Sequence, residues 1–518
     1  MSVQPQETVK PETASRQGSS GTDHAASSRK VLIGLIALLL LLGYAFQGSR
    51  SLWSTDEGRY SGNAAQMLDS GNYLMPAFSP DRINITKPPM TTWVIAGSMD
   101  LFGRNAWAVR APYALAFVLT GLLLFAMGGR LVPDAPWLPS LIYACSLVPF
   151  MGANVVSTDV LLTLFEALAA LGFVRSHFGP RTATGRNGLW LMWLGFGLAF
   201  LTKGPPGLLP LLGMAPFVLR RDGWPGLGRL FTPTGLLLFL VAGFSWYAIV
   251  VMRTPGLLHY YLHYEVYDRL FTGAQGRHSQ WYGWIVVYLP VLSLGTLPWW
   301  PAMGRGIRKA VHAACWRQWW GQATAPLFLL LWFAIPLVVF CLSRSRLPMY
   351  LLPLFLPLSL MLALDLRSRV DLTRNRQRLA LAAWILVLLT LKAVAAYAVH
   401  PKVDNLKRAQ ELEQTTGGAS YDALVFILDK TSHTAVEEST PWGMRIYTHR
   451  PVYGIAWHAQ DRAARVCKEL DREANSLFLI APRIDPAQVA TIMDRCPGHV
   501  TRTVVGAWRH QTLVLVRH

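Results

Sequence analysis

Residues 325–343 read APLFLLLWFAIPLVVFCLS, an apolar run without a charged side chain. Roughly 17–25 such residues are enough to cross the hydrocarbon core of a bilayer as a helix. Further runs of this kind occur at 31–47, 111–129, 136–154, 160–176, 188–202, 205–219, 231–252, 282–303, 347–364 and 380–399. The sequence therefore predicts an all-α polytopic membrane protein with about eleven transmembrane helices.

The composition favours the same class of protein. Of 518 residues, 52% are hydrophobic and 15% are charged, whereas soluble proteins carry about 25% charged residues. The net charge of +19 would suggest a nucleic-acid partner in a soluble protein, but no basic stretch matches a recognition motif. Lys and Arg instead lie in short loops between apolar runs, where they fix orientation. We therefore expect membrane lipids around the chain and no nucleic acid.

The start of the chain is polar. Residues 1–30 are rich in Ser, Gln, Thr and Gly, which predicts a disordered, cytoplasmic N-terminus. The apolar run after it could be a signal peptide, but no small-residue cleavage site follows. We interpret it as a retained first transmembrane helix.

The short apolar run Met90–Phe102, which contains Asp100, decides the topology. If it does not span, the basic residues of the loops at 130, 175–186, 220–229, 305–317 and 367–378 all lie on the cytoplasmic side. If it spans, they move outside, against the positive-inside rule. We therefore expect residues 88–103 to form an amphipathic helix along the outer interface.

The same topology places a set of ionisable residues on the outer face. The loops 48–110, 155–159, 203–204, 253–281 and 343–346 lie outside, and charged groups near membrane depth are costly and usually functional. These residues are Asp56, Glu57, Arg59, Lys87, Asp159, Lys203, Glu265, Asp268, Arg269, Arg277, Arg344 and Arg346. The sequence thus predicts a site at the outer face of a transmembrane domain over 31–400.

Residues 401–518 differ from the rest of the chain. Apolar segments at 423–428, 444–447, 476–480, 500–505 and 512–516 predict strands, and 461–474 predicts an amphipathic helix. We expect a small periplasmic α/β domain. Cys467 and Cys496 lie within it, and an oxidising compartment permits a disulfide between them, but the sequence leaves that pairing open.

Several motifs occur together in one order. They are Asp56-Glu57-Gly58-Arg59-Tyr60, Lys87-Pro88-Pro89, Leu101-Phe102-Gly103, Arg110, Thr158-Asp159, Thr202-Lys203-Gly204-Pro205, Glu265-x-x-x-Arg269-Leu270-Phe271 and Arg346-Leu347-Pro348-x-Tyr350. As a set, over about residues 30–365, they resemble bacterial members of the protein O-mannosyltransferase superfamily. That group includes the aminoarabinose transferase of lipid A and has the membrane fold called GT-C.

The resemblance implies an inverting transfer of a sugar from a polyprenyl-phosphate donor in the bacterial inner membrane. The acceptor would be lipid A, another glycan or a protein. This chemistry needs a carboxylate to orient or deprotonate the acceptor and cations to stabilise the departing phosphate. The residues expected to act in catalysis are Asp56, Glu57, Lys87 and Arg269, and those expected to bind substrate are Arg59, Tyr60, Asp159, Lys203, Glu265, Arg346 and Tyr350.

Cofactors are less well defined. No nucleotide is expected, because no phosphate-cradling Gly-rich loop is present. A divalent metal stays open, because this chain has Thr86 where members of the family that it resembles place a Glu directly before Lys-Pro. His259, His263 and His278 fit no strong ligand motif, so we favour interfacial hydrogen bonding for them, and the nearby tyrosines favour an interfacial belt.

Structural alternatives accompany these residues. Asp56 and Glu57 could cap a helix, as could Asp159; Glu265 could pair with Arg269 four residues on; and Lys203 could snorkel. A polytopic lipid or small-molecule transporter is the alternative function, although the sequence lacks the internal repeat such a protein often has. A non-enzymatic scaffold would leave the clustered outer charges unexplained.

Overall fold

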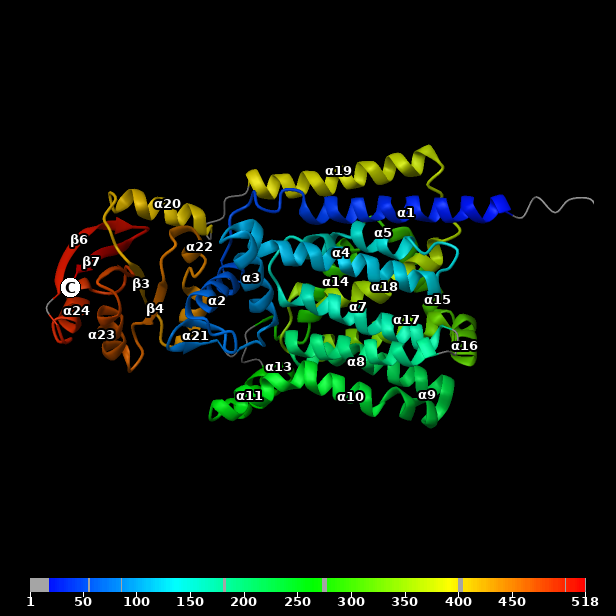
Figure 1. Cartoon of the computed structure of the whole chain (residues 1–518), viewed down its shortest axis with the longest axis horizontal. Coiled ribbons are helices and arrows are strands. Elements are labelled where there is room, and N and C mark those ends of the chain that lie inside the picture. The colour runs from blue at the N-terminus through cyan, green and yellow to red at the C-terminus, as the bar shows by residue number, and fades with distance from the viewer. Residues whose placement is uncertain are drawn as a thin grey trace, which may run out of the picture.

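The computed structural model describes residues 18–54, 56–84, 86–179, 183–272, 277–398, 404–498 and 500–517. A bundle of long helices is followed by an α/β domain at one end (Figure 1). The first helix, α1, begins at Gly18, so residues 18–30 extend the first apolar run as helix, where the sequence suggested disorder. Once nucleated, a helix propagates into flanking polar residues at little cost. The preceding residues 1–17 lie outside the described part.

Most helices of the bundle overlap the predicted apolar runs, whereas the helix Ala313–Gln322 falls in the predicted loop between the runs 282–303 and 325–343. The elements of the bundle are α1 Gly18–Tyr44, α4 Ala106–Leu131, α5 Leu138–Cys145, α6 Leu147–Gly152, α7 Thr158–His177, α8 Ala183–Lys203, η1 Pro205–Leu208, α9 Leu209–Leu230, α10 Pro233–Phe239, η2 Leu240–Phe244, α11 Ser245–Arg253, α14 Gly283–Gly295, α15 Trp300–Val311, α16 Ala313–Gln322, α17 Ala325–Leu342, η4 Pro348–Leu354, α18 Phe355–Leu366 and α19 Asn375–Tyr397.

Within the described residues, six helices are long and apolar enough to cross a membrane, or seven if α14 and the start of α15, bent by 116°, count as one span. Other predicted runs are divided into shorter pieces. The run 136–154 breaks at Ser146, whose backbone is extended (φ −79°, ψ 137°). The all-α membrane fold is confirmed, and the number of eleven spans stays a prediction.

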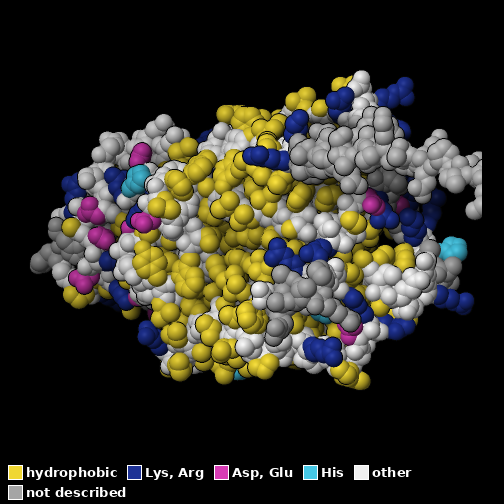
Figure 2. Space-filling model, turned by 45° about the vertical axis from the view of Figure 1, so that its right-hand side comes forward, with side chains coloured by type: hydrophobic (Ala, Val, Ile, Leu, Met, Phe, Trp, Pro, Cys, Tyr) yellow, Lys and Arg dark blue, Asp and Glu magenta, His cyan; other side chains and the backbone are white. Residues whose placement is uncertain are grey.

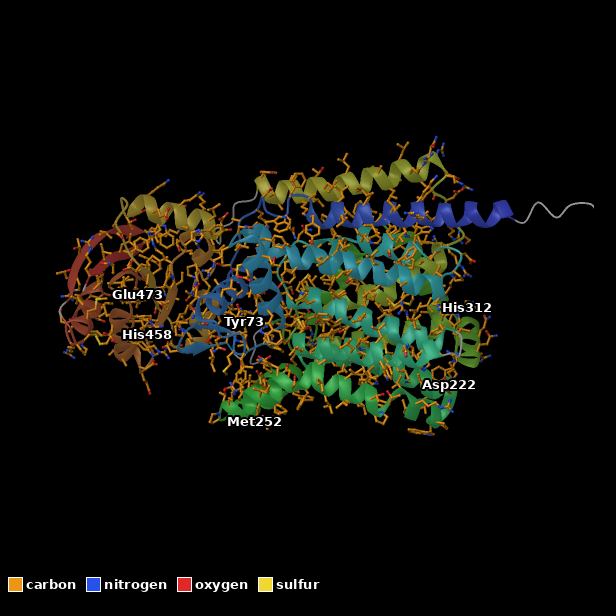
Figure 3. The ribbon with its side chains drawn as sticks, in the orientation of Figure 1. Tyr73, Asp222, Met252, His312, His458 and Glu473 are labelled. Atoms are coloured by element: carbon orange, nitrogen blue, oxygen red, sulfur yellow. A yellow bond between two sulfur atoms is a disulfide. The ribbon has the colours of Figure 1, made fainter. Side chains whose placement is uncertain are left out.

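The smaller elements lie at one end of the bundle. They are α2 Asp56–Ser70, β1 Ala77–Ser79, β2 Arg82–Ile83, α3 Met90–Phe102, α12 Leu257–Tyr260, η3 Tyr261–Tyr267 and α13 Asp268–Phe271. We call this the outer end, because it holds the loops predicted to lie outside and the C-terminal domain. Tyr73 and Met252 lie toward this end, whereas Asp222 and His312 lie at the opposite end (Figure 3). Between the charged ends, Figure 2 shows a broad apolar surface, as a membrane-embedded bundle requires.

The C-terminal domain contains a five-stranded sheet in the order β4-β3-β5-β7-β6. Strands β3 Ala423–Leu428, β4 Val452–Ala456 and β5 Asn475–Ile480 are parallel, and β6 Thr501–Trp508 and β7 Gln511–Arg517 are antiparallel. Its helices are α20 Asn405–Thr415, α21 His433–Ser439, α22 Met444–Thr448, α23 Arg462–Arg472 and α24 Pro486–Met493. All of β3 is buried, as is typical of a central parallel strand.

Two details of this domain could not be settled from the sequence. The predicted strand 444–447 is wrong: it is the helix α22, and the strand β4 follows at Val452–Ala456. Arg445 of α22 donates a hydrogen bond to Gln66 of α2 at 2.6 Å and pairs with Asp69, so packing on the membrane domain overrides local β propensity. Cys467 and Cys496 form a disulfide, with their Cα atoms 5.2 Å apart.

Candidate active site

A cavity of about 540 Å³ opens at the outer end of the bundle. The start of α7, the end of α8, α11, η3 and the loop between α17 and η4 contribute to its wall. Five of the predicted site residues line it, namely Lys87, Asp159, Lys203, Glu265 and Tyr350. Residues from distant parts of the sequence are thus brought together in one hollow.

Lys203 and Asp159 form the first charged pair of this cavity. The Nζ atom of Lys203 donates to Asp159 Oδ1, and the two side chains are 9% and 6% exposed. Lys203 Nζ also lies 4.1 Å from the centroid of the Tyr350 ring, close enough for a cation–π contact. Ser157, not Asp159, caps α7. The Lys203 ammonium is therefore held against the cavity wall and does not snorkel away from it.

Lys87 and Glu265 form the second pair. Their Nζ and Oε2 atoms are 2.8 Å apart, and each side chain is 16% exposed. The segment that presents Lys87 is ordered by Asn84, whose Oδ1 accepts hydrogen bonds from the Thr86 hydroxyl at 2.7 Å and the Thr86 amide at 3.3 Å. Glu265 thus pairs across the cavity rim. Arg269 lies in α13, but its side chain falls outside the described residues.

The rest of the cavity is largely apolar. Its wall includes Leu162, Phe200, Leu209, Phe244, Val251, Leu258, Leu262, Val266, Val339 and Phe340. Tyr261 also lines it, whereas Tyr264 and Tyr267 are 52% and 51% exposed, which agrees with a belt role for the latter two. Ammonium groups beside an apolar hollow suit an amphiphile with an anionic head.

Glu57 occupies a different environment. Its two carboxylate oxygens accept hydrogen bonds from Arg110 at 2.9 and 2.9 Å and from Arg50 at 2.7 and 2.8 Å, and a further one from the Trp53 amide at 3.0 Å. Burial opposes ionisation, but the charges and hydrogen bonds of Arg110 and Arg50 lower the pKa of Glu57 to about 2. Glu57 does not line the cavity; it joins α2 to α4.

Asp56, Arg59 and Tyr60 lie on the first turns of α2, also outside the cavity wall. The Asp56 carboxylate is 60% exposed and accepts a hydrogen bond from Arg59 at 2.7 Å. The guanidinium of Arg59 lies 5.5 Å from the centroid of the Tyr60 ring. Asp56 is thus an accessible carboxyl group at the outer end, available to a molecule that approaches from outside.

Arg346 supports a loop and does not line the cavity. Its guanidinium donates to the carbonyl oxygens of His278 at 2.6 Å, Gln280 at 2.8 Å and Cys341 at 3.0 Å, and the side chain is buried. The structure therefore places Arg346 as an anchor for the loop before α14, and its expected contact with substrate stays a prediction.

Glu166 is not among the site residues predicted from the sequence. It is buried in α7, on the same face as Asp159 and Thr163, and interacts electrostatically with Lys203 and Asp159. A Glu inside an apolar transmembrane run often marks a functional site. Thr163 follows Asp159 by four residues and Glu166 follows Thr163 by three, so Glu166 lies on the same face of α7, one to two turns further into the bundle. It extends the charged pair into the bundle.

A metal site was left open by the sequence. Across the described ranges, no group of three or more His, Cys, Asp or Glu side chains could hold a metal ion. Asp159 and Glu265 are each paired with a lysine, and the rings of His259 and His263 stack with centroids 5.2 Å apart. Within the described residues, the acidic side chains of the cavity are thus engaged by lysines.

The chain is similar in sequence to known membrane glycosyltransferases. Residues 86–249 match the family described as dolichyl-phosphate-mannose-protein mannosyltransferase. The chain is 34% identical to undecaprenyl phosphate-alpha-4-amino-4-deoxy-L-arabinose arabinosyl transferase 2 of Sodalis glossinidius over 64% of this chain and 58% of the relative. It is 32% identical to the corresponding transferase of Aeromonas salmonicida over 70% of this chain and 65% of the relative. The chain thus spans about three fifths of the length of these curated relatives.

A solved structure shares the fold. The crystal structure of ArnT from Cupriavidus metallidurans bound to undecaprenyl phosphate superposes with a TM-score of 0.67 at 18% identity, covering 94% of this chain and 97% of that chain. The chain therefore has the polytopic membrane fold of that protein. Its similarity to the protein O-mannosyltransferase superfamily and to the lipid A aminoarabinose transferases is confirmed.

Proposed function

We propose that this protein is an inverting membrane glycosyltransferase that moves a sugar from a polyprenyl-phosphate carrier to an envelope acceptor at the outer face. The observation that carries the proposal is the cavity in which Lys87 and Lys203 accompany an apolar wall. An isoprenoid phosphate has the matching chemistry, with a long apolar chain and an anionic head. The relatives are named for an undecaprenyl-phosphate donor, and the structural neighbour holds undecaprenyl phosphate.

In the proposed reaction, a nucleophile of the acceptor attacks the anomeric carbon, a bond to that carbon forms, and its bond to the phosphate oxygen breaks. The polyprenyl phosphate leaves with the electron pair of that bond. Lys87 and Lys203 stabilise the negative charge that grows on the phosphate. Glu265 and Asp159 hold these two ammonium groups in place. On the sequence argument, Arg269 adds a bidentate contact to the phosphate.

Asp56 is the proposed base that orients or deprotonates the acceptor. Its 60% exposure and its location on the first turn of α2 support this role. Arg59 and Tyr60 flank it and are proposed to contact the acceptor. Glu57, enclosed by Arg50 and Arg110, would act as a positioning residue that fixes the start of α2.

The helices support a multi-pass protein, for which we propose the bacterial inner membrane with the C-terminal domain in the periplasm. The disulfide between Cys467 and Cys496 supports an oxidising compartment for that domain. Single cysteines introduced at the exposed positions Asn72, Gly417 and Ser368 test the orientation in spheroplasts. Impermeant maleimide should label the first two and not the third. Labelling of Ser368 without Asn72 would reverse the topology.

The activity itself can be tested with purified protein, a polyprenyl-phosphate-linked 4-amino-4-deoxy-arabinose donor and lipid A. Glycosylated lipid A detected by mass spectrometry, with release of polyprenyl phosphate, is the expected result. The same assay with other glycans and with protein acceptors defines the acceptor class. Movement of the donor across proteoliposomes without any product would instead favour the transporter.

A further inference from the structure

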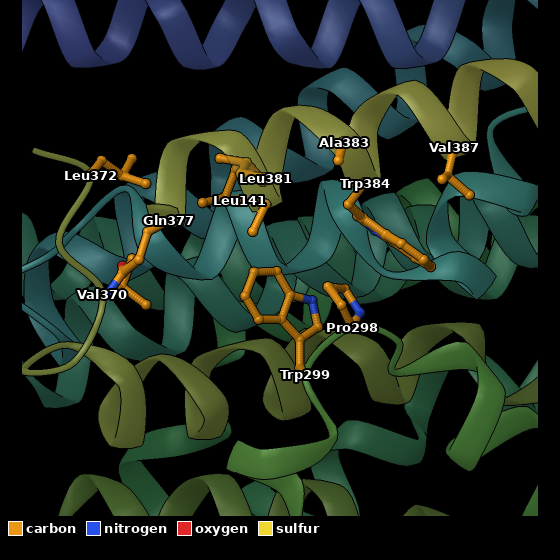
Figure 4. A pocket seen from close by; sticks show the side chains of 11 residues that line it. Leu141, Pro298, Trp299, Val370, Leu372, Gln377, Leu381, Ala383, Trp384 and Val387 are labelled. Atoms are coloured by element: carbon orange, nitrogen blue, oxygen red, sulfur yellow. The ribbon is translucent and has the colours of Figure 1, made fainter. Parts of the chain in front are cut away.

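A second cavity, of about 470 Å³, lies on the membrane-facing side of the bundle. It is a groove bordered by α19, α5, the break between α14 and α15, and the loop before α19 (Figure 4). Apart from Gln377, its lining is hydrophobic, and it shares no lining residue with the candidate active site. The groove is therefore a separate feature.

The position and depth of the groove match one leaflet of a bilayer. Its lining begins at the loop residue Val370 and rises along α19 to Val387. The helical part, from Gln377 to Val387, spans roughly 15 Å at the rise of an α-helix, which is half of the ~30 Å hydrocarbon core. Only 17% of the apolar stretch of α19 is buried, so the groove is open to lipid.

The base of the groove is strongly basic. Arg369 and Arg376 are exposed on the loop and first turn beside it, and among the described residues neither has an acidic partner. Two neighbours are already engaged, since Arg367 pairs with Asp134 at 3.3 Å and Arg374 with Asp371 at 3.2 Å. Basic residues at the edge of a membrane attract anionic headgroups.

Trp299 forms part of the groove wall, below α19 and beside Pro298 in this view (Figure 4). The groove thus offers an apolar surface that continues from the exposed arginines along α19. The positive-inside rule explains the arginines alone, but it does not explain an apolar groove that begins beside them.

We propose that this groove is a binding site for an anionic phospholipid, with one acyl chain along α19 and the headgroup at Arg369 and Arg376. The inference does not depend on the proposed glycosyltransferase activity, because it uses none of the residues of the candidate active site.

The test is native mass spectrometry of the full-length protein in detergent, titrated with dioleoyl-phosphatidylglycerol or dioleoyl-phosphatidylcholine. The protein should retain the anionic lipid with roughly tenfold preference, because the single net negative charge of its headgroup would face two arginines. Ala383→Trp fills the groove and should reduce that retention by a similar factor. Ala382→Trp is the matched control, because Ala382 is the adjacent exposed residue and does not line the groove.

A further double variant separates charge from shape. Arg369→Gln combined with Arg376→Gln should abolish the preference for the anionic lipid. Equal retention of both lipids, or equal retention by the Ala383→Trp and Ala382→Trp proteins, would overturn the proposal. So would loss of undecaprenyl phosphate, and not of phosphatidylglycerol, from the Ala383→Trp protein, since the groove would then hold the carrier.

Discussion

Two clusters of buried charge lie near the outer end, and they differ in what surrounds them. Around Glu57, two arginines and a backbone amide fill the hydrogen-bonding directions of the carboxylate. In the cavity, Lys203 pairs with Asp159 and Lys87 with Glu265 beside about 540 Å³ of open space. A closed cluster fixes the fold, whereas charges that border a cavity can interact with a ligand.

The cation types reinforce this difference. Arginine presents a rigid fork of donors that suits a permanent bidentate pair, as in Arg110 with Glu57. Lysine carries a compact charge with three rotatable donors, so Lys87 and Lys203 can turn toward a phosphate while their carboxylates stay in place. We therefore expect substitution of Lys87 or Lys203 to lower activity, and substitution of Glu57 to lower the stability of the fold.

The largest expected effect is on catalysis by the cavity lysines. Lys87→Ala and Lys203→Ala should each lower the transfer rate by roughly 10²–10³-fold, the usual cost of losing a group that stabilises developing charge. Lys407→Ala is the control, because Lys407 is exposed on α20 far from the cavity wall. Single-turnover rates give the measurement. Normal transfer rates in both cavity variants would show that the cavity lysines do not act in transfer, and the proposed difference between the two clusters would be wrong.

A second effect concerns the acid next to Glu57 in the sequence. Asp56→Asn should lower the transfer rate by roughly 10²-fold, the lower range for losing a general base, and leave the melting temperature unchanged, because Asp56 is 60% exposed. Asp100→Asn, at an exposed position on α3, serves as the comparison. Near-normal turnover of the Asp56→Asn protein would remove Asp56 from the mechanism.

Glu57→Gln should act on stability first. It leaves Arg50 and Arg110 buried without their carboxylate, which costs about 3–5 kcal/mol, and thermal unfolding in detergent reports the loss. The pKa of Glu57 is lowered from 4.5 to about 2, so the stabilisation by its charge is present above about pH 4.5 and declines as the pH falls toward 2. The gap between the melting temperatures of wild type and variant should hold from pH 8 to 5 and narrow below that. A constant gap down to pH 3 would contradict this role.

The smallest expected effect is at Arg346. A lysine there cannot donate to all three carbonyls of His278, Gln280 and Cys341 at once. Arg346→Lys should therefore loosen the loop and raise KM for the donor by roughly threefold to tenfold, about 1 kcal/mol for the hydrogen bonds lost, with kcat nearly unchanged. A large fall in kcat at unchanged KM would instead indicate direct contact with the reacting groups.

The sequence predicts which charged residues gather at the candidate cavity, because polar residues in or near apolar surroundings are conspicuous. Asp159 and Lys203 adjoin apolar runs and Lys87 and Glu265 lie in the predicted outer loops, and all four line the cavity. The order of the predicted spans, which puts successive loops on alternate sides of the membrane, was enough to place these residues at one end of the bundle. Helix boundaries were less predictable, because proline and polar residues divide some runs into pieces whose arrangement depends on packing.

The pairing of Glu57 with Arg50 and Arg110 could not be predicted from the sequence. Arg110 is 53 residues from Glu57 along the chain, and the two meet only in the folded protein, where α3 packs on both α2 and α4. The helix α22 is similar, since its contact with α2 joins residues 379 apart in the sequence. Long-range contacts of this kind decide whether a charge faces a cavity or a partner, and a local pattern contains no information about them.

The most direct measurement is the affinity of the purified protein for undecaprenyl phosphate in wild type, the double variant Lys87→Ala with Lys203→Ala, and Glu57→Gln. We predict that the double variant binds at least roughly tenfold more weakly, because both phosphate-facing charges are gone. We also predict that the Glu57→Gln protein, assayed below its lowered melting temperature, binds almost normally. Unchanged affinity in the double variant together with lost affinity in Glu57→Gln would contradict the assignment of the two clusters.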